Sequence, residues 1–460
     1  MTTQDMRRDL LMLGDRVTER ALKAGADVAE ASVHQSLHLS AKVRLKAPEL
    51  VEEAGSRGVG LRVMCGQQVA VAHTSDLSDA GLDRFIEDAI ELVRLTQPDR
   101  FSGPPDSALL SSMAEHQQLD LFDATIDGID AEEGLHRAKA AEVAAFEYDP
   151  RVLNSEGSSF SRVSGGSAIV TSGGFRGFTQ GTYASIVVNP VVDDTDGKKR
   201  SGYYFSSRRH LSDMECEREV GREASRRTLA KLGSRRVPTQ HAPVVFDPDT
   251  ARSMLSLFAG CINGSAIWRR ASYLADREAS VVASELVTIV DDPFIPRGPG
   301  SRAYDGEGLL SRRNIIVEGG VLKTYLLDSY SARKLNKAST ASASRSASGG
   351  IGPSTSNFML KPGDMTAEDL LASTAKGLYV TDMMGFGFNA VTGDFSRGAS
   401  GFWIENGEKA HPVSEVTISL NLDQILKRID AVANDLHMDS SIMSPTFRVS
   451  EMTIAGHAHS

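Results

Sequence analysis

Residues 157–181 read GSSFSRVSGGSAIVTSGGFRGFTQG, and this stretch decides the fold class of the chain. Runs of Ser, Thr and aliphatic residues alternate here with glycine turns, which is typical of antiparallel sheet. We therefore predict antiparallel sheet over residues 151–210. Nearer the amino terminus, five apolar residues occupy every second position, which predicts a half-buried strand: Leu37, Leu39, Ala41, Val43 and Leu45.

Helical patterns flank these strands. Apolar residues recur at helical spacing over residues 10–21 and 82–93. The start signature D-x-x-E predicts a helix over 130–148, and an S-x-x-E capping box predicts another over 212–232. The mixture of helix and antiparallel strand indicates an α+β protein.

The last 220 residues are rich in predicted strands. A hairpin is predicted at 313–327, and Asn406-Gly407 is the strongest short hairpin signal in the chain. Stretches of linker composition lie at 97–118 and near residue 240. We therefore expect an amino-terminal α/β subdomain, a central antiparallel-sheet and helix subdomain, and a β-rich carboxyl-terminal domain, at residues 1–100, 119–236 and 240–460.

Residues 338–356 (ASTASASRSASGGIGPSTS) contain one large apolar side chain, Ile351. Such a run buries too little apolar surface to fold alone. We expect a mobile loop, or a segment ordered only by a partner, that proteases cut first near Arg345.

Composition and charge exclude several classes of protein. No apolar run approaches the ~20 residues of a membrane helix, and the polar amino terminus lacks the apolar core of a signal peptide. Three cysteines without a C-x-x-C indicate reduced thiols in a cytoplasmic protein rather than a disulfide scaffold. A net charge of -10 makes nucleic-acid binding an unfavoured class. Residues 197–236 are the exception, with twelve Lys/Arg against five Asp/Glu; we interpret them as a solvated helix face, with a nucleic-acid patch as the alternative.

The common catalytic motifs are absent from the sequence. It has no G-x-G-x-x-G, no P-loop, no G-x-S-x-G and no H-E-x-x-H. His34 and His38 lie on a predicted strand, where positions four apart are separated by ~13 Å, too far for one metal ion. His457 and His459 lie at the frayed carboxyl terminus. Residue chemistry alone therefore supports no catalytic site.

The carboxyl-terminal third is more informative. VTGDFSRGASGFWIENG, residues 391–407, closely resembles the TldD/PmbA family (peptidase family U62), as do residues 305–335 and 377–390. The resemblance extends to EEAGSRGVGLRVMCGQQVAVAHTSDLS, residues 52–78, and so covers essentially the whole chain. It implies a two-part α+β fold, with a mixed α/β amino-terminal region and a β-rich carboxyl-terminal domain. It also implies a TldD–TldE heterodimer that degrades or trims peptides with zinc.

The zinc motif that the resemblance implies, a helical H-E-x-x-x-H with a late cysteine ligand, is not present here. Anchored on Gly260, Ser256 and Cys261 stand at the histidine positions and Leu257 at the glutamate position, and no cysteine follows Cys261. Three protein ligands and a general base are needed for zinc hydrolysis. The chain therefore resembles the PmbA/TldE-like subunit that lacks the zinc motif. We expect no catalytic residue, metal or cofactor in this chain, and Cys261 as a small buried hydrophobe.

Three functional hypotheses remain. The first is a non-zinc subunit of a cytoplasmic metalloprotease complex that acts on unfolded peptides, with zinc on a TldD-like partner; homodimer formation in isolation is left open. The second is a regulatory binding protein, in line with the family label modulator of DNA gyrase. The third is a self-sufficient peptidase. The glycine-rich segment predicts turns, or a docking edge for a peptide or partner, and its candidate contacts are Ser396, Arg397, Gly398 and Gly401.

Overall fold

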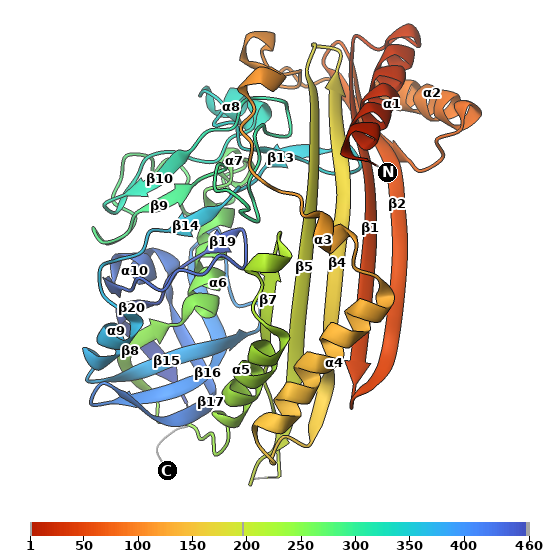
Figure 1. Ribbon diagram of the computed structural model, residues 1–460. Coiled ribbons are helices and arrows are strands. Elements are labelled where there is room, and N and C mark those ends of the chain that lie inside the picture. Colours follow the sequence, from red (N-terminus) through yellow and green to blue (C-terminus); the bar gives the residue numbers. More distant parts are fainter. Residues whose placement is uncertain (1, 196, 457–460) are drawn as a thin grey trace.

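The strand predicted at residues 37–45 belongs to β1 (Val28–Arg44), which lies inside a long antiparallel sheet (Figure 1). The computed structural model describes residues 2–195 and 197–456. Seven strands of this described part pair in the order β3-β2-β1-β4-β5-β6, and β7 also pairs with β5. Their bounds are β2 (Ala47–Cys65), β3 (Gln68–Thr74), β4 (Asn154–Thr171), β5 (Arg176–Asp193), β6 (Lys199–Ser201) and β7 (Tyr204–Arg208). Residues 157–181 form the β4–β5 pair, so the prediction of antiparallel sheet is confirmed.

Helices cover one face of this sheet in two groups. In β1, Val33 is buried in a core with α1 and α2, whereas Leu39 and Val43 are buried in a second core with α4 and α5. Because alternate residues of a strand face opposite ways, the other face carries the polar residues, His34 among them. The helices are α1 (Thr3–Lys23), α2 (Asp79–Leu95), α3 (Ala124–Asp127), α4 (Ala131–Tyr148) and α5 (Glu217–Leu229), with short 3-10 turns at Ser107–Leu109, Met113–Glu115 and Leu211–Asp213.

The predicted start of the fourth helix is wrong. The helix α5 begins at Glu217 with Cys216 as its cap, not at the expected capping box of Ser212 and Glu215. The Glu215 carboxylate instead accepts a hydrogen bond from the Tyr204 hydroxyl at 2.8 Å, and the Glu215 amide donates to Ser206 Oγ at 3.1 Å. These bonds to β7 replace the cap.

The carboxyl-terminal body is built around a sheet that closes on itself. The strands run β17-β16-β15-β8-β20-β18, and β17 also pairs with β20. Their bounds are β8 (Gln240–Phe246), β15 (Lys376–Met384), β16 (Asp394–Glu405), β17 (Glu408–Asn421), β18 (Ile429–Val432) and β20 (Phe447–Ala455). The predicted Asn406-Gly407 hairpin joins β16 to β17, and both turn residues have positive φ, 53° and 79°, as a two-residue hairpin turn requires.

A second sheet, in the order β11-β10-β9-β14-β19, packs over the same core. It contains the other predicted hairpin, with Gly319 and Gly320 at the turn. Its strands are β9 (Ile289–Asp291), β10 (Asn314–Glu318), β11 (Val321–Leu322), β14 (Phe358–Leu360) and β19 (Ile442–Met443). The helices of this body are α6 (Pro248–Cys261), α7 (Gly264–Trp268), α8 (Ser329–Leu335), α9 (Ala367–Ala372) and α10 (Leu422–Lys427).

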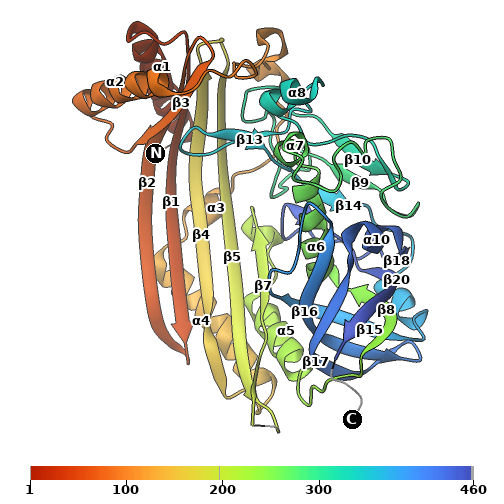
Figure 2. The same ribbon diagram turned by 180° about the vertical axis from the view of Figure 1, so that it is seen from behind.

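Residues 338–356 differ from the prediction of an unfolded loop. They contain a two-stranded arm, β12 (Ala343–Arg345) and β13 (Ile351–Pro353), that reaches across the first sheet (Figure 2). At its tip the side chain of Arg345 is 2% exposed and forms an ion pair with Glu30 of β1 at 2.7 Å. Polar contacts with the amino-terminal sheet of the same chain, rather than apolar burial within the segment, hold the arm in place.

The α+β, two-part fold predicted from the resemblance is confirmed: a mixed amino-terminal region lies beside a β-rich carboxyl-terminal body (Figure 1). The expected division between residues 100 and 119 does not separate two sheets, because β1–β3 and β4–β7 share one. No helix in residues 2–195 and 197–456 is long and apolar enough to cross a membrane.

Candidate functional site

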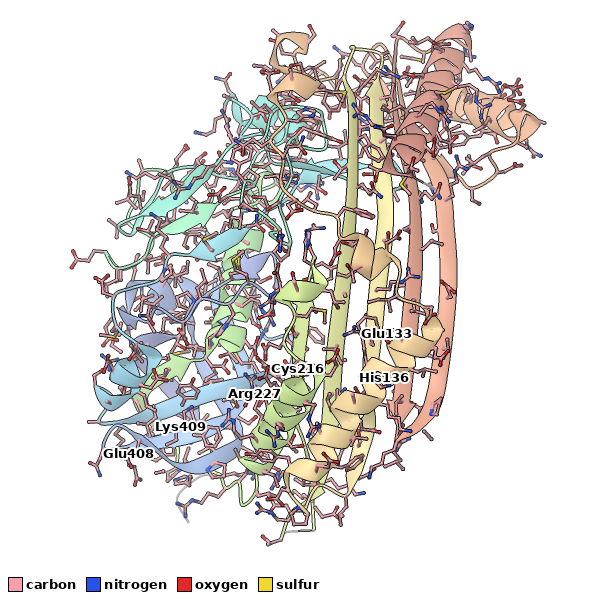
Figure 3. The ribbon with its side chains drawn as sticks, in the orientation of Figure 1. Glu133, His136, Cys216, Arg227, Glu408 and Lys409 are labelled. Atoms are coloured by element: carbon pink, nitrogen blue, oxygen red, sulfur yellow. The ribbon has the colours of Figure 1, made fainter. Side chains whose placement is uncertain are left out.

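A cleft opens between the two bodies. It encloses a cavity of about 340 Å³, with β7 and α5 on one wall and the start of α6, the sheet β15–β17 and the segment 435–444 on the other. Figure 3 shows Arg227 of α5 and Lys409 of β17 near this junction. Five aromatic side chains line it: Tyr203, Tyr204, Phe205, Tyr379 and Phe402.

The cleft contains five Lys and Arg side chains, and four of them form ion pairs. The Glu223 carboxylate accepts hydrogen bonds from Arg226 at 2.7 Å and from Arg227 at 2.8 Å. Arg227 also contacts Asp249 at 3.4 Å. The remaining pairs are Arg252–Asp249 at 3.1 Å and Lys231–Asp382 at 3.2 Å. The basic segment predicted as a solvated helix face is therefore partly neutralised, and one side of it lines the cleft.

Lys409 is the fifth cation, and it differs from the others. Its Nζ lies 3.6 Å from the centre of the Tyr379 ring and 5.5 Å from that of Phe402. Within the described residues no carboxylate comes close enough to form an ion pair with it. Lys409 is exposed at the edge of the cleft, and its ammonium contacts aromatic faces rather than a counter-ion.

Asp247 lies at the base of the cleft and caps α6. Its Oδ1 accepts hydrogen bonds from the Thr250 amide at 2.9 Å and the Thr250 hydroxyl at 2.7 Å. Burial removes the carboxylate from water and raises the pKa of Asp247 to about 7, although both hydrogen bonds favour the charged form. At neutral pH this group can therefore give up or take a proton.

The candidate contact residues Ser396, Arg397, Gly398 and Gly401 all lie in β16. This strand pairs with β15 on one side and β17 on the other, so a peptide cannot add to it as a new strand. The φ of Gly398 is not positive, so backbone conformation does not require glycine at this position. Gly401 has the close approach instead: an added Cβ would lie 1.9 Å from the Tyr379 carbonyl oxygen. Contact of these residues with a peptide or partner stays a prediction.

The motif helix α6 separates the three positions expected to replace zinc ligands. Ser256 is exposed, Leu257 packs partly against the core, and Cys261 is fully buried. Five helical residues turn about 140° around the axis, which accounts for the opposite environments of Ser256 and Cys261. The three side chains therefore lie in different environments, from solvent to the core.

Three family models cover most of the chain. They are the PmbA/TldA metallopeptidase domain 1, central domain and C-terminal domain, which match residues 29–93, 124–232 and 239–456. The chain belongs to the PmbA/TldD family. Metalloprotease PmbA from Escherichia coli O157:H7 is 34% identical over 434 residues, 94% of this chain and 93% of its own length. The Metalloprotease PmbA homolog of Haemophilus influenzae is 35% identical over 444 residues, 95% and 94% of the two chains.

Solved structures share the same fold. A Bacteroides thetaiotaomicron protein that bears the label modulator of DNA gyrase superposes with a TM-score of 0.90 at 27% identity, over 97% of this chain and 98% of its own. TldE from Thermococcus kodakarensis gives a TM-score of 0.86 at 20% identity, over 96% and 100% of the two chains.

In this PmbA/TldD family member, the residues at the motif positions of α6 are not suited to bind a zinc ion. A thiol binds zinc as thiolate, but burial raises the pKa of Cys261 to about 12. A serine and a leucine supply neither a strong ligand nor a general base. Among the described residues, no three His, Cys, Asp or Glu side chains are grouped as a metal site requires; His457 and His459 lie outside them.

The family motif did not point to the cleft. The residues that line the cleft are spread from 203 to 444 in the sequence. Asp247 is among them, and in the sequence Asp-Pro-Asp it indicates only the start of a helix. The one usable sign was the +7 charge of residues 197–236, which contributes Arg226, Arg227 and Lys231.

Proposed function

We propose that this chain is the non-zinc subunit of a cytoplasmic PmbA/TldD peptidase complex. In it, a TldD-type partner carries the zinc and the complex degrades or trims unfolded peptides. The observation that carries the proposal is the state of α6, where the three motif positions hold an exposed serine, a leucine and a buried thiol. A chain with the complete family fold but without the ligands is most simply explained if another chain supplies the chemistry.

An exposed apolar group beside β16 supports a partner surface there. Phe386 is 97% exposed, and Met384 and Val391 flank it with more than half of their surfaces free. Exposed apolar residues of this size gather at protein interfaces. The group directly precedes the candidate contacts Ser396, Arg397 and Gly398, which we propose to lie in the same interface.

A regulatory binding protein is the second candidate. The gyrase-modulator label of the Bacteroides relative favours it, as does the basic segment. Against it, Arg226, Arg227 and Lys231 already have carboxylate partners and line a cleft with aromatic walls, whereas phosphate backbones are bound by exposed cations. A gene for an H-E-x-x-x-H family member beside this one would favour the first candidate.

Elemental analysis of the purified chain tests the proposal. We expect well under one equivalent of zinc, because serine and leucine are not zinc ligands and the remaining thiol, Cys261, is buried. Replacing Ser256→His, Leu257→Glu and Cys261→His together should still not give full activity, since no cysteine follows position 261 to supply the further ligand. Stoichiometric zinc after dialysis, with chelator-sensitive cleavage of an unstructured peptide by this chain alone, would establish the self-sufficient peptidase instead.

A further inference from the structure

Lys409 brings a positive charge into the cleft without a counter-ion. Its ammonium lies over the Tyr379 ring, at 3.6 Å, at the edge of the 340 Å³ cavity. The other four cations of the cleft form ion pairs with Glu223, Asp249 or Asp382. An anionic group that enters the cavity would therefore meet one cation that is free to pair with it.

The carboxyl groups around Lys409 do not neutralise it. Asp247, whose charge acts on Lys409, is 8% exposed and has a pKa raised to about 7 by burial. Asp435 accepts hydrogen bonds from the Thr446 amide and hydroxyl at 2.8 Å and 2.7 Å and forms no ion pair with Lys409. Surrounding protein lowers the pKa of Lys409 itself, and a ligand carboxylate would oppose that shift.

The walls of the cavity suit a short stretch of extended chain. Tyr203, Tyr204 and Phe205 line it from the start of β7, and among the described strands β7 pairs only with β5. The other edge of β7 has no strand partner among the described residues, and its exposed start, near Tyr203, is where a peptide backbone would add. The cavity is near the lower limit of ligand pockets, about 300–1,000 Å³, and so has room for only a few residues of a peptide.

We propose that the cleft binds the carboxyl-terminal end of a peptide, with the terminal carboxylate on Lys409 and the last side chains between the aromatic walls. This inference rests on the proposed function in its choice of a peptide as ligand. It adds which end of the peptide this subunit holds and which residue recognises that end.

Binding to the full-length chain alone tests the inference. The probes are two peptides, fluorescein-Gly-Ala-Phe-Leu as the free acid and as the carboxyl amide, measured by fluorescence anisotropy. We expect the free acid to bind at least tenfold more tightly than the amide. Lys409→Gln should abolish that preference. Lys376→Gln is the matched control, because Lys376 also lies over an aromatic ring, Trp403 at 5.6 Å, but does not line the cleft.

Equal affinities of acid and amide, or an unchanged preference in a folded Lys409→Gln variant, would overturn the inference. A third peptide, with Asp in place of Phe and an amidated end, carries a side-chain carboxylate but no terminal one. It distinguishes recognition of the chain terminus from recognition of any carboxylate. If it binds as tightly as the free acid, recognition of the chain terminus is wrong. The assay needs no partner, so a preference for the free acid stands even if no zinc-bearing subunit is found. Conversely, if the wild-type chain shows no preference for the free acid but does reconstitute peptidase activity with a partner, this inference is wrong and the proposed function stands.

Discussion

Asp247 caps α6 and lies at the base of the cleft, and these two positions act on its carboxylate in opposite directions. Hydrogen bonds from Thr250 favour the charged form, whereas burial disfavours it more strongly, which leaves the pKa at about 7. Nearby charges modify the balance: Asp249 raises the pKa and Arg227 lowers it, and Lys409 and Tyr379 lie in the same cleft. Asp247 is therefore predicted to couple stability to pH.

We expect Asp247→Asn to remove a pH-dependent loss of stability. In the unfolded chain the carboxyl ionises near its ordinary pKa of 3.8, but in the folded chain only near 7. The wild-type free energy of unfolding should therefore fall as pH rises through this window, since the folded state binds the extra proton. Asparagine keeps the acceptor for Thr250, so the variant should match wild type near pH 4 and exceed it by about 1–4 kcal/mol at pH 8. Urea unfolding of both proteins from pH 4 to 8 measures this, and parallel profiles would contradict it.

Among the elements, the β12–β13 arm differs most clearly from the structure that its composition predicts. Serine-rich sequence predicted a loop that proteases reach, yet the Arg345 side chain lies buried between Glu30 and the Gly306 carbonyl, at 2.7 Å from each. Arg62 adds a second contact to Glu30 at 3.2 Å. Close packing continues at Gly60, where an added Cβ would lie 2.5 Å from the Ala347 carbonyl oxygen.

We expect Glu30→Gln to release the arm. Removing one partner of a buried ion pair leaves Arg345 uncompensated, which costs about 3–5 kcal/mol. Asp79→Asn is the control, because its ion pair with Arg20 is exposed and contributes about 0–1 kcal/mol. Trypsin should cut at Arg345 readily in Glu30→Gln and slowly in wild type and the control. Rapid cleavage of wild type at Arg345 would restore the expectation of a mobile loop.

These elements also show what sequence can predict here. Local signals succeeded: the alternation in β1, the helical spacing of α1 and α2, and the Asn406-Gly407 turn each depend on neighbours in the chain. Prediction failed where a distant residue decided the outcome, as Glu30 does for Arg345 and Tyr204 does for Glu215. The cleft was missed for the same reason, because Asp247 and Lys409 become neighbours only in the folded chain.

At the scale of the whole molecule, two bodies meet along a cleft that contains aromatic residues, one unpaired cation and a protonatable carboxyl, but no grouped metal ligands among the described residues. The exposed Phe386 lies in the carboxyl-terminal body, on the loop that leads into β16. On the proposed function, the cleft receives peptide and the surface near Phe386 binds the zinc-bearing subunit. Replacing Phe386 should then weaken assembly without affecting the fold.

The most direct test is the rate of peptide cleavage when this chain is titrated into a TldD-type family member that carries H-E-x-x-x-H. We expect no cleavage by this chain alone and a saturable, chelator-sensitive rise in rate on mixing. Phe386→Ser should shift the titration midpoint at least tenfold. Leu95→Ser, the same kind of apolar-to-polar change at the exposed end of α2, should not. A mixture no faster than the partner alone would contradict the account, as would chelator-sensitive cleavage by this chain by itself.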